Sequence, residues 1–182
     1  MPTNENCVPT LTDARRPGEI VVGVDDGPAA AAAVRWAADQ SRLTGLPLCV
    51  VHAWQLGPLE SAALTSGAGV AELLEAAGAD ARARATQWVR DALGSQGDRV
   101  LWRLEVVQGA SGPALVAESR GAHLLVIGTQ EHSGLRRAVL GSVSHYCLSH
   151  AQAPVVAIPV ADQARDDRPV SRDVFATAGP LL

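Results

Sequence analysis

The chain has 182 residues, of which 47% are hydrophobic and only 3% aromatic, and its formal net charge is −4. This length predicts one domain with tails, with a core built mainly from Ala, Val and Leu. The sequence has no basic run, so we do not expect nucleic-acid binding. It has no apolar stretch near the roughly 18–20 residues that span a bilayer, so we do not expect a membrane span. Three widely spaced cysteines and a polar N-terminus favour a cytoplasmic protein with reduced thiols.

Apolar runs and helical patterns alternate along residues 19–160, which we interpret as the folded domain. The predicted strands are residues 20–24, 48–54, 100–107, 124–127 and 155–158, and the last two end at Gly128 and Pro159. The predicted helices are residues 29–43, 70–93, 111–120 and 142–151. This alternation predicts an α/β domain: a five-stranded parallel sheet with helices on both faces. We expect residues 1–18 to form a mobile arm and residues 161–182 a disordered tail.

The stretch from residue 123 to 144, HLLVIGTQEHSGLRRAVLGSVS, reads as a strand, a glycine-bearing loop and a helix N-terminus. Glycine lets the backbone approach a ligand, and a helix N-terminus attracts phosphate through its free N–H groups and its dipole. The loop exceeds the roughly 2–6 residues typical of such a connection, and long loops are often functional. Both a phosphate site and a connection that binds nothing remain open here.

The first predicted strand ends at Asp25, just before a helix that starts near Pro28. In a parallel sheet, ligands bind beyond the carboxyl ends of the strands, where the strand order reverses. If the first and fourth strands are neighbours, Asp25 faces the glycine loop and can accept hydrogen bonds from ribose hydroxyls. The alternative role for Asp25 is to cap the helix.

The residues Gly128-Thr129, Gly134-Leu135-Arg136 and Leu140-Gly141-Ser142-Val143-Ser144 resemble the signature of the universal stress protein family. That signature is a glycine, two residues, a second glycine, nine residues and then Gly-Ser. The resemblance covers roughly residues 19–160 and includes Ile20–Asp25 and Val51-His52-Ala53. It implies a Rossmann-like parallel sheet of order 3-2-1-4-5, of the adenine nucleotide alpha hydrolase-like type, and a role in stress responses.

The resemblance also implies a ligand and a partner. Many family members bind ATP, so ATP or AMP is expected, with Mg²⁺ and without a metal site made of protein side chains. The strand 155–160 is expected to form a homodimer, and other protein partners are unknown. By position, Asp25 would contact ribose and Ala53 would contact adenine, and residues 141–144 would contact the phosphates. The implied site comprises Val24, Asp25, Ala53, Ile127, Gly128, Gly141, Ser142, Val143 and Ser144.

Two acidic residues depart from the family pattern. Glu131 takes the place of the middle glycine, and Asp26 adds a second carboxylate beside Asp25. Unit charges about 4 Å apart repel by roughly 1 kcal/mol in water, so both acids disfavour a triphosphate. Three alternatives would offset this effect: Glu131 points to solvent, Glu131 helps to hold Mg²⁺, or Arg136 or Arg137 brings positive charge over the loop. Two hypotheses follow: a nucleotide-dependent dimeric sensor, or a nucleotide-free dimeric interaction module of the same fold.

We do not expect an enzyme beyond slow ATP hydrolysis. The chain has no lysine and no GxxxxGK[ST] loop. His145 follows Ser144 directly on the predicted helix, where adjacent side chains do not face each other, so a Ser–His nucleophile is not expected.

Overall fold

The structure is a computed structural model that describes residues 18–25, 27–57, 69–130 and 141–160. Its elements in chain order are β1 (Ile20–Val24), α1 (Pro28–Thr44), β2 (Leu48–Trp54), α3 (Val70–Leu93), the 3₁₀ helix η2 (Gly94–Arg99), β3 (Trp102–Gln108), α4 (Ser111–Glu118), β4 (Leu124–Gln130), α5 (Ser142–His150) and β5 (Val155–Val160). The sheet has five strands in the order β3-β2-β1-β4-β5, and every neighbouring pair is parallel. The predicted α/β fold and strand order are therefore confirmed. No helix in the described part of the chain is long and apolar enough to cross a membrane.

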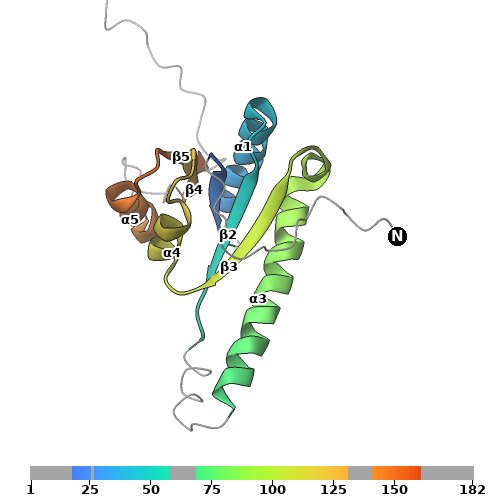
Figure 1. The fold of residues 1–182 in the computed structure, drawn as a ribbon, viewed down its shortest axis with the longest axis vertical. Coiled ribbons are helices and arrows are strands. Elements are labelled where there is room, and N and C mark those ends of the chain that lie inside the picture. The colour runs from blue at the N-terminus through green and yellow to red at the C-terminus, as the bar shows by residue number, and fades with distance from the viewer. Residues whose placement is uncertain (1–17, 26, 58–68, 131–140, 161–182) are drawn as a thin grey trace, which may run out of the picture.

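Helices cover both faces of the sheet, with α1 and α3 on one side and α4 and α5 on the other (Figure 1). Side chains alternate along each strand, so the core divides into two clusters. Ile20 and Val22 pack with the alanine-rich face of α1 and with α3, whereas Val21 and Leu125 pack with α4 and α5. The alanines of α1 bring this helix close to the sheet, which places its first turn beside the ends of β1 and β4.

Two strand ends predicted from the apolar pattern alone are wrong. β4 continues past Gly128 to Gln130, and β5 continues past Pro159 to Val160. Pro159 is tolerated because β5 lies at the edge of the sheet, where a proline that lacks an N–H need not break a ladder hydrogen bond. Smaller differences fall within the usual uncertainty of element ends: β3 begins at residue 102, after η2, and α4 ends at residue 118.

An ion-pair network connects the residue before β1 with edge strand β3. Glu19 is buried, and its carboxylate accepts hydrogen bonds from Arg103, with 2.8 Å between Nη2 and Oε2 and 3.4 Å between Nε and Oε1. Arg103 also contacts the carboxylate of Glu105. Burial alone would lower the pKa of the Arg103 guanidinium, but its hydrogen bond to Glu19 and the nearby carboxylates outweigh burial and raise this pKa. The buried carboxylate of Glu19 thus has a permanently charged partner.

The Cys49 thiol makes the stability of the domain depend on pH in the alkaline range. Burial raises the pKa of its thiol from 9.0 to about 12, although the Arg103 charge opposes this shift. An unfolded chain ionises this thiol near pH 9.0 while the folded chain keeps it protonated up to about pH 12, so stability falls as pH rises through this window. We expect the wild type to lose up to about 1.4 kcal/mol per pH unit in the window from this thiol, and Cys49→Ala to lack this contribution.

Urea denaturation at pH values from 8 upward measures this difference in slope. Val51→Ala is the matched control, because Val51 lies on the same strand in the same core cluster and does not titrate. Parallel stability curves for the wild type and Cys49→Ala would contradict the expected role of the thiol.

Candidate functional site

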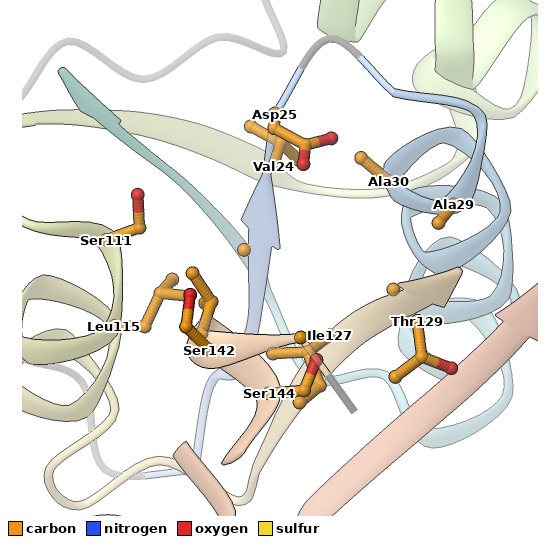
Figure 2. Close-up of a pocket in the computed structure, with 14 residues that line it drawn as sticks. Val24, Asp25, Ala29, Ala30, Ser111, Leu115, Ile127, Thr129, Ser142 and Ser144 are labelled. Atoms are coloured by element: carbon orange, nitrogen blue, oxygen red, sulfur yellow. The ribbon is translucent and has the colours of Figure 1, made fainter. Parts of the chain in front are cut away.

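A cavity of about 260 Å³ lies at the carboxyl ends of β1 and β4, where the strand order reverses (Figure 2). This is the position at which parallel α/β sheets bind ligands. The structure brings together eight of the nine predicted site residues in its wall: Val24, Asp25, Ile127, Gly128, Gly141, Ser142, Val143 and Ser144.

Ala53 is the predicted site residue that does not line the cavity. It lies near the end of β2 and pairs with Val107 of β3. The carbonyl of the next residue, Trp54, accepts a hydrogen bond from the Gly109 N–H at 2.9 Å, which ties the end of β2 to the connection that precedes α4. The contact of Ala53 with adenine stays a prediction.

Three helices begin at the cavity: α1, α4 and α5. Their N-cap residues are Gly27, Ala110 and Gly141, and none of them provides a side-chain cap. The first backbone hydrogen bond of each helix is accepted by its N-cap carbonyl, so the N–H groups of the first turn have no partner within the helix. Each helix end carries the equivalent of about half a positive charge. The three ends together favour a ligand with an anionic group.

Asp25 is the charged side chain among the described residues that line the cavity. Its Oδ1 accepts a hydrogen bond from the Gly27 N–H at 2.8 Å, which fixes the carboxylate just before α1. Asp25 therefore does not cap α1 itself, because the N-cap is Gly27, but its carboxylate binds the N–H of that residue. In Figure 2 the carboxylate lies above the cavity, between β1 and α1. This position suits hydrogen bonds from hydroxyl groups and disfavours phosphate.

The two signature glycines within the described residues have different physical roles. A Cβ on Gly128 would lie 2.5 Å from the backbone carbon and oxygen of Ala29, so glycine is needed there to seat the first turn of α1 on β4. Among the described residues, a Cβ on Gly141 would meet no atom within 4 Å, and its backbone angles (φ −59°, ψ 161°) suit any residue. Gly141 therefore leaves space open at the start of α5 without being required by the fold.

Two largely buried residues of the wall carry a hydroxyl group. Ser144 is 4% exposed and Thr129 is 9% exposed. Neither hydroxyl has a hydrogen-bond partner among the residues that the structure describes. Neither hydroxyl oxygen is among the fully buried unpaired atoms of the described residues, so both are available to hydrogen-bond a polar ligand in the cavity.

Six lining residues were not predicted: Gly23, Ala29, Ala30, Ser111, Leu115 and Thr129. A usable signal existed for part of this set. The sequence Ser111-Gly112-Pro113 predicted the start of a helix directly after a strand, and such a helix begins at the edge of the sheet where ligands bind. Asp26, Glu131, Arg136 and Arg137 lie outside the described residues.

The fold and the cavity define a Rossmann-like α/β protein with a cavity at its topological switch point. The chain belongs to the universal stress protein family, whose model matches residues 18–159.

Curated relatives and solved structures agree with this assignment. The chain is 36% identical to the universal stress protein Rv2623 of Mycobacterium tuberculosis over 146 residues, which is 76% of this chain and 46% of the relative. It is 31% identical to a universal stress protein of Mycolicibacterium smegmatis over 155 residues, which is 81% of this chain and 50% of the relative. The chain thus spans about half the length of these relatives. The solved UspA of Lactobacillus plantarum has the same fold, with a TM-score of 0.58 at 21% identity over 80% of this chain and 99% of that chain.

Proposed function

We propose that this chain binds an adenine nucleotide, ATP or AMP, in the cavity between β1 and β4, and acts as a cytoplasmic, nucleotide-dependent regulatory protein of the stress response. The observation that carries the proposal is the convergence of three uncapped helix N-termini on a cavity with one carboxylate at its mouth. The helix ends suit phosphate, and Asp25 suits ribose hydroxyls. A solved universal stress protein in complex with cAMP has a TM-score of 0.53 to this chain, which supports an adenine nucleotide of some kind.

Charge balance distinguishes the candidate nucleotides. Three helix ends supply the equivalent of about +1.5 charges, which Asp25 partly offsets. The described lining residues include no Arg. Within the described ranges, no group of three or more His, Cys, Asp or Glu is placed to hold a metal ion. We therefore propose that ATP enters as its Mg²⁺ complex, in which the metal is held by the phosphates, whereas AMP needs no metal.

The test begins with protein purified without added nucleotide. The protein is denatured, and the supernatant is analysed by ion-exchange chromatography to identify and count the released nucleotides. Calorimetric titration of nucleotide-free protein with ATP–Mg²⁺, AMP and cAMP follows. Released or saturably bound adenine nucleotide supports the proposal. An empty supernatant with three flat titrations contradicts it and favours the nucleotide-free interaction module.

We predict that Gly141→Glu abolishes nucleotide binding without unfolding the domain. Its Cβ would enter open space, while its carboxylate would lie at the start of α5 and repel phosphate. At about 4 Å such a repulsion amounts to several kcal/mol at a protein surface, so we expect at least about a 100-fold loss of affinity by calorimetry. Gly141→Ala adds the same Cβ without the charge and should bind within a few-fold of wild type. Binding retained by Gly141→Glu would place the site elsewhere.

We further propose that β5 mediates a homodimer. β5 is an edge strand whose residues are half-buried apart from Pro159, and Val156 belongs to neither core cluster. We expect wild type to sediment as a dimer and Val156→Lys as a monomer, because a charge would be buried in the interface. Leu43→Lys is the control, since Leu43 is an exposed apolar residue on α1. A wild type that sediments as a monomer, or a Val156→Lys variant that stays dimeric, would contradict this interface.

A further inference from the structure

Leu115 of α4 fills the space above Gly23 of β1. A Cβ on Gly23 would lie 2.6 Å and 2.7 Å from the two terminal methyl groups of Leu115. Both residues line the cavity, and Leu115 is 4% exposed. Position 23 therefore needs glycine because the Leu115 side chain occupies the space that a Cβ would take. The same side chain forms the wall of the cavity between α4 and β1.

The chemistry of the other walls indicates which part of a nucleotide meets Leu115. The N–H groups and hydroxyls at the start of α5 suit phosphate, and the carboxylate of Asp25 suits hydroxyl groups. The α4 wall offers an aliphatic side chain with Ser111 at its rim, opposite the alanines of α1 (Figure 2). An aliphatic surface suits the uncharged ring system of a purine.

We infer that Leu115 is a specificity-determining residue. Its side chain sets the width of the cavity where the purine base binds and so limits the size of the purine that fits. This inference rests on the proposed nucleotide binding. It assigns a role to α4, whereas the family signature concerns the loop after β4 and the start of α5.

Two substitutions change this width in opposite directions. Leu115→Ala removes the wall and enlarges the cavity. Gly23→Ala puts a methyl group against the flexible end of the Leu115 side chain, which must move, and the cavity is the open space beside it. The double variant combines both changes, so the added methyl group occupies part of the vacated space. Val116→Ala is the matched control, because Val116 is a partly buried neighbour on α4 that does not line the cavity.

The experiment measures the affinities of wild type and these variants for six probes by calorimetry. The probes are AMP and ATP–Mg²⁺, their 1,N⁶-etheno forms with an enlarged base, and their mant forms with an enlarged ribose. We expect Leu115→Ala to raise the affinity for the etheno form relative to the parent nucleotide by about tenfold, as one or two methylene groups do in apolar pockets. Gly23→Ala should lower this ratio, the double variant should return it toward wild type, and Val116→Ala should leave it unchanged. The mant ratio should stay constant throughout.

The outcomes separate the two proposals. If wild type binds adenine nucleotides but the etheno ratio is the same in Leu115→Ala and Gly23→Ala as in wild type, the role of Leu115 is overturned and the proposed function stands. A change in the mant ratio instead would place Leu115 at the ribose and also overturn the inference. Wild type that binds none of the six probes overturns both proposals. If Leu115→Ala fails to fold, the ratio in Gly23→Ala decides, and an unchanged ratio overturns the inference.

Discussion

Replacing Arg103 by methionine is expected to destabilise the domain by up to about 3–5 kcal/mol, the range found when one partner of a buried ion pair is removed, because Glu19 is buried although the Arg103 side chain is 27% exposed. The substitution keeps much of the aliphatic volume but leaves the Glu19 carboxylate buried without the guanidinium that donates two hydrogen bonds to it. A buried charge without a partner is the unfavourable element here, more than the loss of the attraction itself. Urea denaturation at neutral pH measures the change in the free energy of unfolding.

Two comparison variants test this explanation. Arg84→Met removes an arginine whose ion pair with Asp80, at 2.6 Å, is exposed, with 72% and 60% of the two side chains accessible. Exposed pairs contribute about 0–1 kcal/mol, so this variant should change stability little. Glu19→Gln combined with Arg103→Met removes both charges and should recover a large part of the loss. Equal losses in Arg103→Met and Arg84→Met would contradict a special role for the buried carboxylate.

Gly128→Ala is expected to destabilise the domain by about 1–3 kcal/mol or more and to weaken nucleotide binding. The added methyl group would lie 2.5 Å from the Ala29 backbone, which cannot move aside as a side-chain end can. The first turn of α1 must therefore shift away from β4, and its N–H groups and Asp25 shift with it. Affinity and stability should fall together.

Thermal unfolding with and without nucleotide, together with calorimetry, measures both effects. Gly141→Ala is the matched control, because it makes the same chemical change where the backbone angles suit alanine and the space is open. Such a change should be neutral or slightly stabilising. A Gly128→Ala variant as stable as Gly141→Ala would show that α1 does not pack on β4 as described.

The sequence allowed the α/β class to be predicted because fully buried parallel strands leave continuous apolar runs. The helices between them show apolar residues at helical spacing. The strand order came from the family resemblance. Local signals failed at Gly128 and Pro159, which look like strand breakers in isolation. Their roles depend on neighbours far along the chain: the first turn of α1 for Gly128, and the edge position of β5 for Pro159. Local propensity does not contain that information.

The wall of the candidate cavity was predictable where the family signature supplies its residues, and not where tertiary structure assembles it. The end of β1 and the start of α5 were expected, whereas the α4 wall was not, because Leu115 in sequence is an ordinary apolar helix residue. Gly128 was predicted to lie at the site, but its packing against α1 was not foreseen. The effects of Asp26 and Glu131 on phosphate stay predictions, since both lie outside the described residues.

The missing caps of α1, α4 and α5 have a consequence for how such a protein could signal. An anion in the cavity would cap three helices at once, and these helices come from separate parts of the chain and from both faces of the sheet. Binding would therefore tie distant segments together, and local opening of any one of them would first require release of the ligand. Nucleotide binding would then make the protein more rigid, which would be measured as resistance to proteolysis and slower amide exchange. A partner that recognises the opened segments could respond to nucleotide binding without any change in the folded shape.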